Sequence, residues 1–138
     1  KPSAETSIHQ AVYGLFPGVQ ACYHVHSIPA NLVSRLSTTP QILLPAIEMI
    51  KGMGIWDETP QVFLDIFPNH AQVSKIADDM RDRFHQSPPQ IPACLIQDHG
   101  VTVWGASPEE ARNRVEVMEF IFQYAISAQS IDLQKVLG

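Results

Sequence analysis

The sequence predicts an α/β fold, a layered sandwich in which helices flank a central mixed or antiparallel-rich sheet. Segments with the two-residue alternation of strands interleave with segments whose apolar residues recur every three or four positions, as in helices. The 138 residues suffice for one domain with its own core. The sequence has no Gly-rich phosphate-binding loop, which argues against nicotinamide and nucleotide cofactors.

The first helix is expected to follow Ser3, a residue type that caps helix N-termini. Its apolar stripe has helical spacing and consists of Ile8, Ala11, Val12 and Leu15. Glu5 falls in the first turn, where a carboxylate complements the helix dipole. A role for Glu5 in an active site is the alternative.

The segment after the Phe-Pro-Gly turn at 16–18 predicts a strand with two histidines on one face. Side chains alternate along a strand, so His24 and His26 share a face, with alpha carbons about 6.5 Å apart. Two imidazoles at this spacing can bind one transition metal if a third ligand arrives from elsewhere. Two histidines hydrogen-bonded on a sheet face are the alternative.

A third histidine lies at the corner of a predicted hairpin over 93–104. There a strand ends at His99-Gly100 and a second strand follows. This places an imidazole at a rigid strand end rather than on a mobile loop. Three histidines would leave one coordination position open for a substrate.

Segment 41–52 is expected to begin as a strand and to become helical near Pro45. Glu48 and Lys51 then share a helix face. A solvated ion pair is one account of Glu48. The other is a desolvated carboxylate with a raised pKa, as a general acid/base requires.

The remaining elements follow from caps and periodicity. Ser27 is predicted to cap a short helix whose Leu32, Val33 and Leu36 face inward. A strand over 61–67 leads to a helix that Asn69 would cap. The last and longest helix has a cap at Ser107, a proline at its first position and a buried stripe formed by Ala111, Val115, Met118, Phe122 and Ala125.

Composition narrows the classes of partner. The net charge is −5 and the nine Lys and Arg residues are spread along the chain, so no basic stripe could bind nucleic acid. No apolar run approaches the roughly 18 residues of a membrane span. Cys22 and Cys94 are expected to be buried free thiols, which favours a reducing compartment and a cytoplasmic location.

Four motifs, taken in order, resemble those of the class II aldolase and adducin-like family, over nearly the whole chain. They are KPSAET at 1–6, HVHS at 24–27, EMIKG at 48–52 and HGVTVWG at 99–105. The resemblance implies one zinc ion per subunit, held by His24, His26 and His99. It also implies a homotetramer that acts on a small sugar-phosphate substrate.

The resemblance further implies a division of labour between two carboxylates. The acid/base of the family's aldolases matches Glu5, whereas that of its dehydratases matches Glu48. The presence of Glu48 therefore favours a hydro-lyase that dehydrates 5-methylthioribulose 1-phosphate in methionine salvage. Glu5 would contact the substrate, and Lys51 would bind its phosphate or hold Glu48 ionised.

Two other functions remain open at this point. A sugar-phosphate aldolase or epimerase would use the same metal ligands, and a non-catalytic interaction module occurs on the same fold. We expect 1–138 to form a single domain of the family that lacks its usual N-terminal segment. That segment helps to bind the substrate phosphate in the family.

Overall fold

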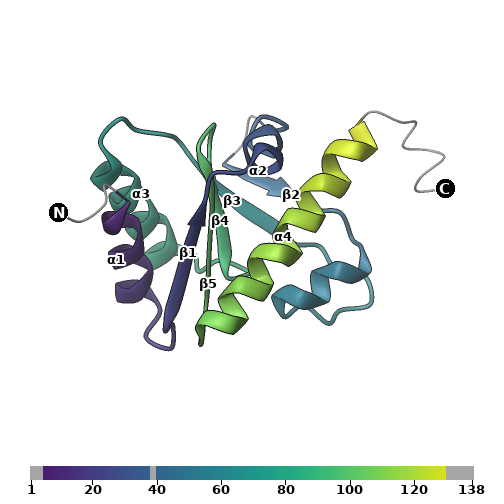
Figure 1. The fold of residues 1–138 in the computed structure, drawn as a ribbon, viewed down its shortest axis with the longest axis horizontal. Helices are drawn as coiled ribbons and strands as arrows, with labels where there is room; N and C mark the ends of the chain where they lie inside the picture. Colours follow the sequence, from purple (N-terminus) through teal and green to yellow (C-terminus); the bar gives the residue numbers. More distant parts are fainter. Residues whose placement is uncertain (1–4, 38–39, 130–138) are drawn as a thin grey trace.

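A computed structural model describes residues 5–37 and 40–129, which form a five-stranded sheet between two helical layers (Figure 1). The strand order is β1-β5-β4-β3-β2. The strands are β1 (Ala21–Val25), β2 (Gln41–Leu43), β3 (Phe63–Phe67), β4 (Ala93–Ile96) and β5 (Gly100–Gly105). Strands β3 and β4 are parallel and the other neighbours are antiparallel. The predicted α/β sandwich with a mixed sheet is confirmed.

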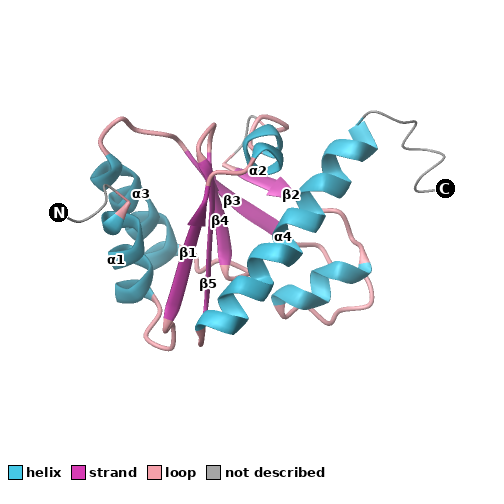
Figure 2. Ribbon diagram, in the orientation of Figure 1, coloured by secondary structure: helices cyan, strands magenta, loops and turns pink. Residues whose placement is uncertain are grey.

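Helices cover both faces of this sheet (Figure 2). Helices α1 (Thr6–Leu15) and α3 (Val73–Gln86) lie on one face. The other face is covered by α2 (Ile28–Val33), the 3-10 helix η1 (Glu48–Met53) and α4 (Pro108–Gln129). Among the described residues, no helix is both long enough and apolar enough to cross a membrane.

Each helical layer encloses its own apolar core. Ile8 of α1 and Ile76 of α3 pack with Phe67 on one side of the sheet. On the other side, Met118 and Phe122 of α4 belong to a second cluster that includes Leu64 of β3 and Leu95 of β4. Because both faces of the sheet are covered, burial along β3 does not alternate, and even Asp65 is only 4% exposed. The Asp65 carboxylate lies 3.6 Å from the Arg83 guanidinium.

Two of the predicted helix caps are confirmed. The Ser27 hydroxyl accepts a hydrogen bond from Ala30 N at 3.1 Å, and the Ser107 hydroxyl accepts one from Glu110 N at 3.1 Å. These bonds satisfy backbone N–H groups that have no partner within the helix. Ser3 lies outside the described residues.

Other expectations at the helices were wrong. Helix α3 begins at Val73 with Gln72 at its N-cap, so Asn69 does not cap it. Segment 41–52 does begin as a strand and become helical, but the helix begins at Glu48 rather than near Pro45. Leu32 and Leu36 are 47% and 43% exposed, because Leu32 lies on the side of α2 that does not face the core and Leu36 lies beyond the end of that helix. Both cysteines are buried and unpaired, as expected.

Candidate metal centre

Three histidines converge where β1 ends beside the β4–β5 turn. The Nε2 atom of His24 lies 2.9 Å from Nε2 of His26 and 3.2 Å from Nε2 of His99. His24 and His26 are brought together by strand alternation, and His99 by the antiparallel pairing of β1 with β5. The structure therefore brings together the three imidazoles that the sequence singled out.

Glu5 joins this cluster from the N-cap of α1. Its Oε1 atom lies 3.4 Å from Nε2 of His99 and 3.9 Å from Nε2 of His26. One ligand atom from each of the four side chains lies within 4.8 Å of the other three. We refer to Glu5, His24, His26 and His99 as the histidine cluster.

The spacing of the histidine cluster fits a metal ion. Two nitrogens bound at about 2.05 Å to a tetrahedral zinc are about 3.3 Å apart, and the two Nε2 separations of 2.9 and 3.2 Å are close to that value. Three imidazoles and a carboxylate are also a donor set that suits divalent transition metals. The cluster could therefore bind a metal.

The other ring nitrogen of two histidines is engaged by a neighbouring side chain. Nδ1 of His24 lies 3.0 Å from the Thr102 hydroxyl, and Nδ1 of His99 lies 3.0 Å from Asn69 Oδ1. Because an amide oxygen only accepts, His99 donates through Nδ1 and presents the lone pair of Nε2 to the cluster. Such partners fix the tautomer and the ring orientation of metal-binding histidines.

Burial favours the metal-binding form of His24 and His99. Burial, together with the neighbouring His99 and His26, lowers the pKa of His24 to about 4. Burial also lowers the pKa of His99. A low pKa leaves the rings neutral at physiological pH, and metal ions bind the neutral imidazole.

The β4–β5 hairpin can approach β1 this closely only because Gly100, the first residue of β5, has no side chain. A Cβ atom on Gly100 would lie 2.3 Å from the carbonyl oxygen of Val25 and 3.1 Å from Cδ2 of His26. Just before the histidine, Asp98 has a positive φ of 53° and accepts two hydrogen bonds from the Arg35 guanidinium at 2.6 and 3.1 Å. The turn that carries His99 is therefore closely packed against β1 and held by the hydrogen bonds between Arg35 and Asp98.

Glu48 and Lys51 lie outside the histidine cluster. Their helix η1 packs beside α4, away from the end of β1 (Figure 1). The Glu48 side chain is 83% exposed, and its Oε1 accepts a hydrogen bond from Lys51 Nζ at 2.6 Å. The sequence allowed either a solvated ion pair or a desolvated carboxylate at Glu48, and the structure of a single chain has the solvated ion pair.

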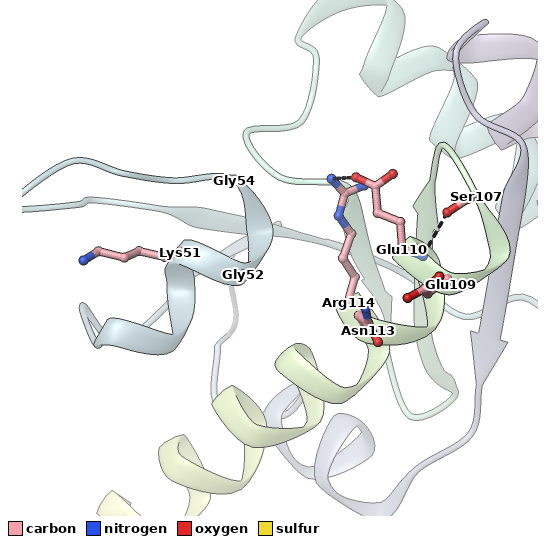
Figure 3. A pocket seen from close by; sticks show the side chains of 8 residues that line it. All are labelled: Lys51, Gly52, Gly54, Ser107, Glu109, Glu110, Asn113 and Arg114. Atoms are coloured by element: carbon pink, nitrogen blue, oxygen red, sulfur yellow. Dashed lines mark hydrogen bonds and ion pairs between the residues drawn. The ribbon is translucent and has the colours of Figure 1, made fainter.

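Several cavities border this helix, and two of them are also lined by α4. One of about 440 Å³ separates η1 from the start of α4, where Arg114 forms an ion pair with Glu110 at 2.5 Å (Figure 3). The Lys51 side chain extends away from that pair. The second, of about 510 Å³, is bordered by Glu48, Phe120 and Tyr124. No residue of the histidine cluster lines either cavity.

Asn69 and Thr102 were missed as members of the site. A signal for Thr102 was present, because residues on paired antiparallel strands face each other and His24 stands opposite Thr102. Asn69 follows the end of β3 directly after Pro68, so its position depends on a contact between distant segments. Local sequence carries no signal for that contact.

Comparisons with known proteins identify the family of this chain. The family model described as the class II aldolase and adducin N-terminal domain matches residues 1–126. The chain is 55% identical over 131 residues to methylthioribulose-1-phosphate dehydratase of Microcystis aeruginosa, covering 95% of this chain and 64% of that protein. It is 44% identical over 128 residues to the protein of the same name from Leptospira biflexa, covering 89% of this chain and 61% of that protein. The chain thus spans less than two thirds of the length of these curated relatives.

Solved structures show the same fold. The crystal structure of YgbL from Escherichia coli superposes with a TM-score of 0.74 at 25% identity, covering 93% of this chain and 58% of that one. L-fuculose-1-phosphate aldolase from Thermus thermophilus superposes with a TM-score of 0.68 at 17% identity, covering 92% of this chain and 61% of that one. The chain belongs to the class II aldolase and adducin N-terminal domain family.

Proposed function

We propose that the chain belongs to a methylthioribulose-1-phosphate dehydratase, a hydro-lyase of methionine salvage. The observation that carries this proposal is the 55% identity to the Microcystis aeruginosa protein of that name in a chain whose three histidines converge. The substrate would be 5-methylthioribulose 1-phosphate and the product 2,3-diketo-5-methylthiopentyl 1-phosphate. The unpaired buried thiols accord with a cytoplasmic enzyme.

The proposed metal is zinc, one ion per subunit, held by His24, His26 and His99. Bound zinc would polarise the ketone of the substrate and acidify the proton on the adjacent carbon. Glu5 lies beside two of these nitrogens, so we assign its carboxylate a contact with the substrate at the same centre.

Glu48 is the proposed general base. It would take the proton from the carbon next to the ketone. The hydroxyl on the following carbon then leaves as water, with its proton supplied by Glu48 or by Glu5 through a water molecule. The resulting enol tautomerises to the diketone, so the reaction consumes no redox cofactor.

This role for Glu48 requires a second subunit. Within one chain Glu48 is exposed and is not part of the histidine cluster, so it would act in the site of a neighbouring subunit of the homotetramer. Met49 and Phe120 beside it are 36% and 50% exposed, as expected for apolar side chains that a neighbouring subunit covers. Lys51, at 2.6 Å, would hold the Glu48 carboxylate ionised and ready to accept a proton.

The test of this proposal is Glu48→Gln, which keeps the shape of the side chain and removes the base. We expect dehydration of the substrate to be lost while the zinc content stays unchanged. Glu116→Gln, at an exposed position on α4, is the matched control and should retain full turnover. Unchanged turnover in Glu48→Gln would reject the assignment.

A sugar-phosphate aldolase or epimerase is the second candidate, and the nearness of Glu5 to the histidines favours it. Product analysis separates the two reactions, since an aldolase cleaves a carbon–carbon bond and a dehydratase releases water. In an aldolase, Glu5→Gln would abolish turnover and Glu48→Gln would not. A purified protein without stoichiometric metal would instead favour a non-catalytic interaction module.

A further inference from the structure

Helix α2 lies against both segments that carry the histidines, and the side chain of Asn31 bonds to both. Asn31 Nδ2 donates to the carbonyl oxygen of Ser27 at 2.8 Å and to that of His99 at 3.0 Å. Ser27 directly follows His26 in the chain. One amide nitrogen therefore joins the segment that ends β1 to the β4–β5 turn.

Asn31 is itself held in place by the helix. Its backbone N–H donates to the Ser27 carbonyl at 3.1 Å, and its own carbonyl accepts a hydrogen bond from the Ser34 hydroxyl at 2.6 Å. Ser34 is fully buried, and its hydroxyl also accepts a hydrogen bond from Asp98 N at 3.0 Å. Helix α2 thus fixes the turn at the residue before His99 and at His99.

We propose that Asn31 is a positioning residue of the metal centre, which sets the separation of His26 and His99 through its two hydrogen bonds. This role rests on the metal site of the proposed function, but not on the reaction. A primary amide has two hydrogens on one nitrogen and can serve both carbonyls at once. A carboxylate in its place has none, and its negative charge would face two carbonyl oxygens.

The decisive experiment compares Asn31→Asp and Asn31→Ala with a matched control. Gln90 also bridges two backbone groups, away from the histidine cluster, donating to Gln61 O at 3.3 Å and accepting from Phe63 N at 2.7 Å. Gln90→Glu therefore removes an amide donor without touching the histidine cluster. For each protein we would measure zinc affinity by chelator competition, the visible absorption of bound Co²⁺, and the thermal unfolding of the metal-free form.

We expect both Asn31 variants to bind zinc about 10-fold or more weakly, as is typical when an outer-sphere partner of a metal site is removed. Their Co²⁺ spectra should change, because the arrangement of the ligands changes. Gln90→Glu should keep the affinity and the spectrum of the wild type. If Asn31→Asp fails to fold, the zinc affinity and the Co²⁺ spectrum of Asn31→Ala are compared with those of the wild type instead, since alanine adds no charge.

Two results would overturn this role. One is wild-type affinity with an unchanged Co²⁺ spectrum in the Asn31 variants, and the other is an equal loss of affinity in Gln90→Glu. Failure of the proposed function looks different. A wild-type protein that binds zinc but dehydrates no substrate would contradict the proposed function and leave the role of Asn31 testable. A wild-type protein that binds no metal would contradict both the proposed function and the role of Asn31.

Discussion

His24 and Thr102 face each other across the β1–β5 ladder, with 3.0 Å between the imidazole Nδ1 and the threonine hydroxyl. Thr102 is fully buried, so no water competes for this contact. The hydroxyl therefore holds the ring of His24 with Nε2 toward His26 and His99.

Replacing this hydroxyl should weaken metal binding with little effect on the fold. Thr102→Val keeps the shape of the side chain but leaves Nδ1 of His24 without its hydroxyl partner. We expect zinc affinity to fall by about 10-fold. Thr102→Ser is the matched control, since it retains the hydroxyl and should bind zinc like the wild type. Equal affinities in the two variants would contradict this role for Thr102.

Metal binding should stabilise the folded protein through the histidine cluster. Zinc at 100 times its dissociation constant should raise the free energy of unfolding by about 2.7 kcal/mol, and a chelator should reverse the change. His26→Ala should abolish the zinc-dependent increase. Because the His26 side chain is 55% exposed, the metal-free variant should unfold within about 0.5 kcal/mol of the wild type.

The control for that experiment is His85→Ala. His85 is exposed near the end of α3 and does not belong to the histidine cluster, so its variant should keep the full response to zinc. A response that persists in His26→Ala would place the stabilising ion at some other site.

Sequence patterns predicted the parts of this site that depend on local rules. Strand alternation put His24 and His26 on one face, and the hairpin corner put His99 at a strand end. The approach of Glu5 depends instead on where α1 packs against the sheet, and that of Asn69 on where β3 ends. Neither contact leaves a periodic signal in the chain.

Burial was harder to predict for a similar reason. The apolar spacing of Leu32 and Leu36 is that of a buried helix face, yet both side chains are exposed. Periodicity identifies an apolar stripe but not the surface that covers it. The two accounts of Glu48 could not be separated from the sequence either, because desolvation depends on whatever packs against η1.

Close packing at the β4–β5 turn makes Gly100 intolerant of any side chain. In Gly100→Ala the added methyl would lie 2.3 Å from the Val25 carbonyl oxygen, so β1 or β5 must shift. Such overpacking costs about 1–3 kcal/mol, and the shift also separates His26 from His99. Both the free energy of unfolding and the zinc affinity should therefore fall.

Gly14→Ala is the matched control for the glycine substitution. A methyl group at Gly14, in α1, meets no atom within 4 Å. Alanine favours a helix over glycine, so this variant should be as stable as the wild type or slightly more stable. Equal losses of stability in the two variants would show that close approach at Gly100 is not the cause.

The two thiols should be unreactive in the folded protein. Burial raises the pKa of Cys22 to about 12, and burial with the nearby Asp65 carboxylate raises that of Cys94. The thiolate is the reactive form, so iodoacetamide at pH 9 should modify neither cysteine until urea unfolds the chain. Mass spectrometry measures this directly, and rapid alkylation of the native protein would contradict the burial of both thiols.

The same shift predicts how stability depends on pH. Above pH 9 the unfolded chain loses its thiol protons, whereas folded Cys22 keeps its proton until about pH 12. The folded state then binds more protons than the unfolded state, so the free energy of unfolding falls as the pH rises from 9 toward 12. Cys22→Ala lacks this titration and should show a shallower fall in urea unfolding between pH 8 and about 10.5. Parallel curves for the two proteins would mean that Cys22 ionises equally in both states.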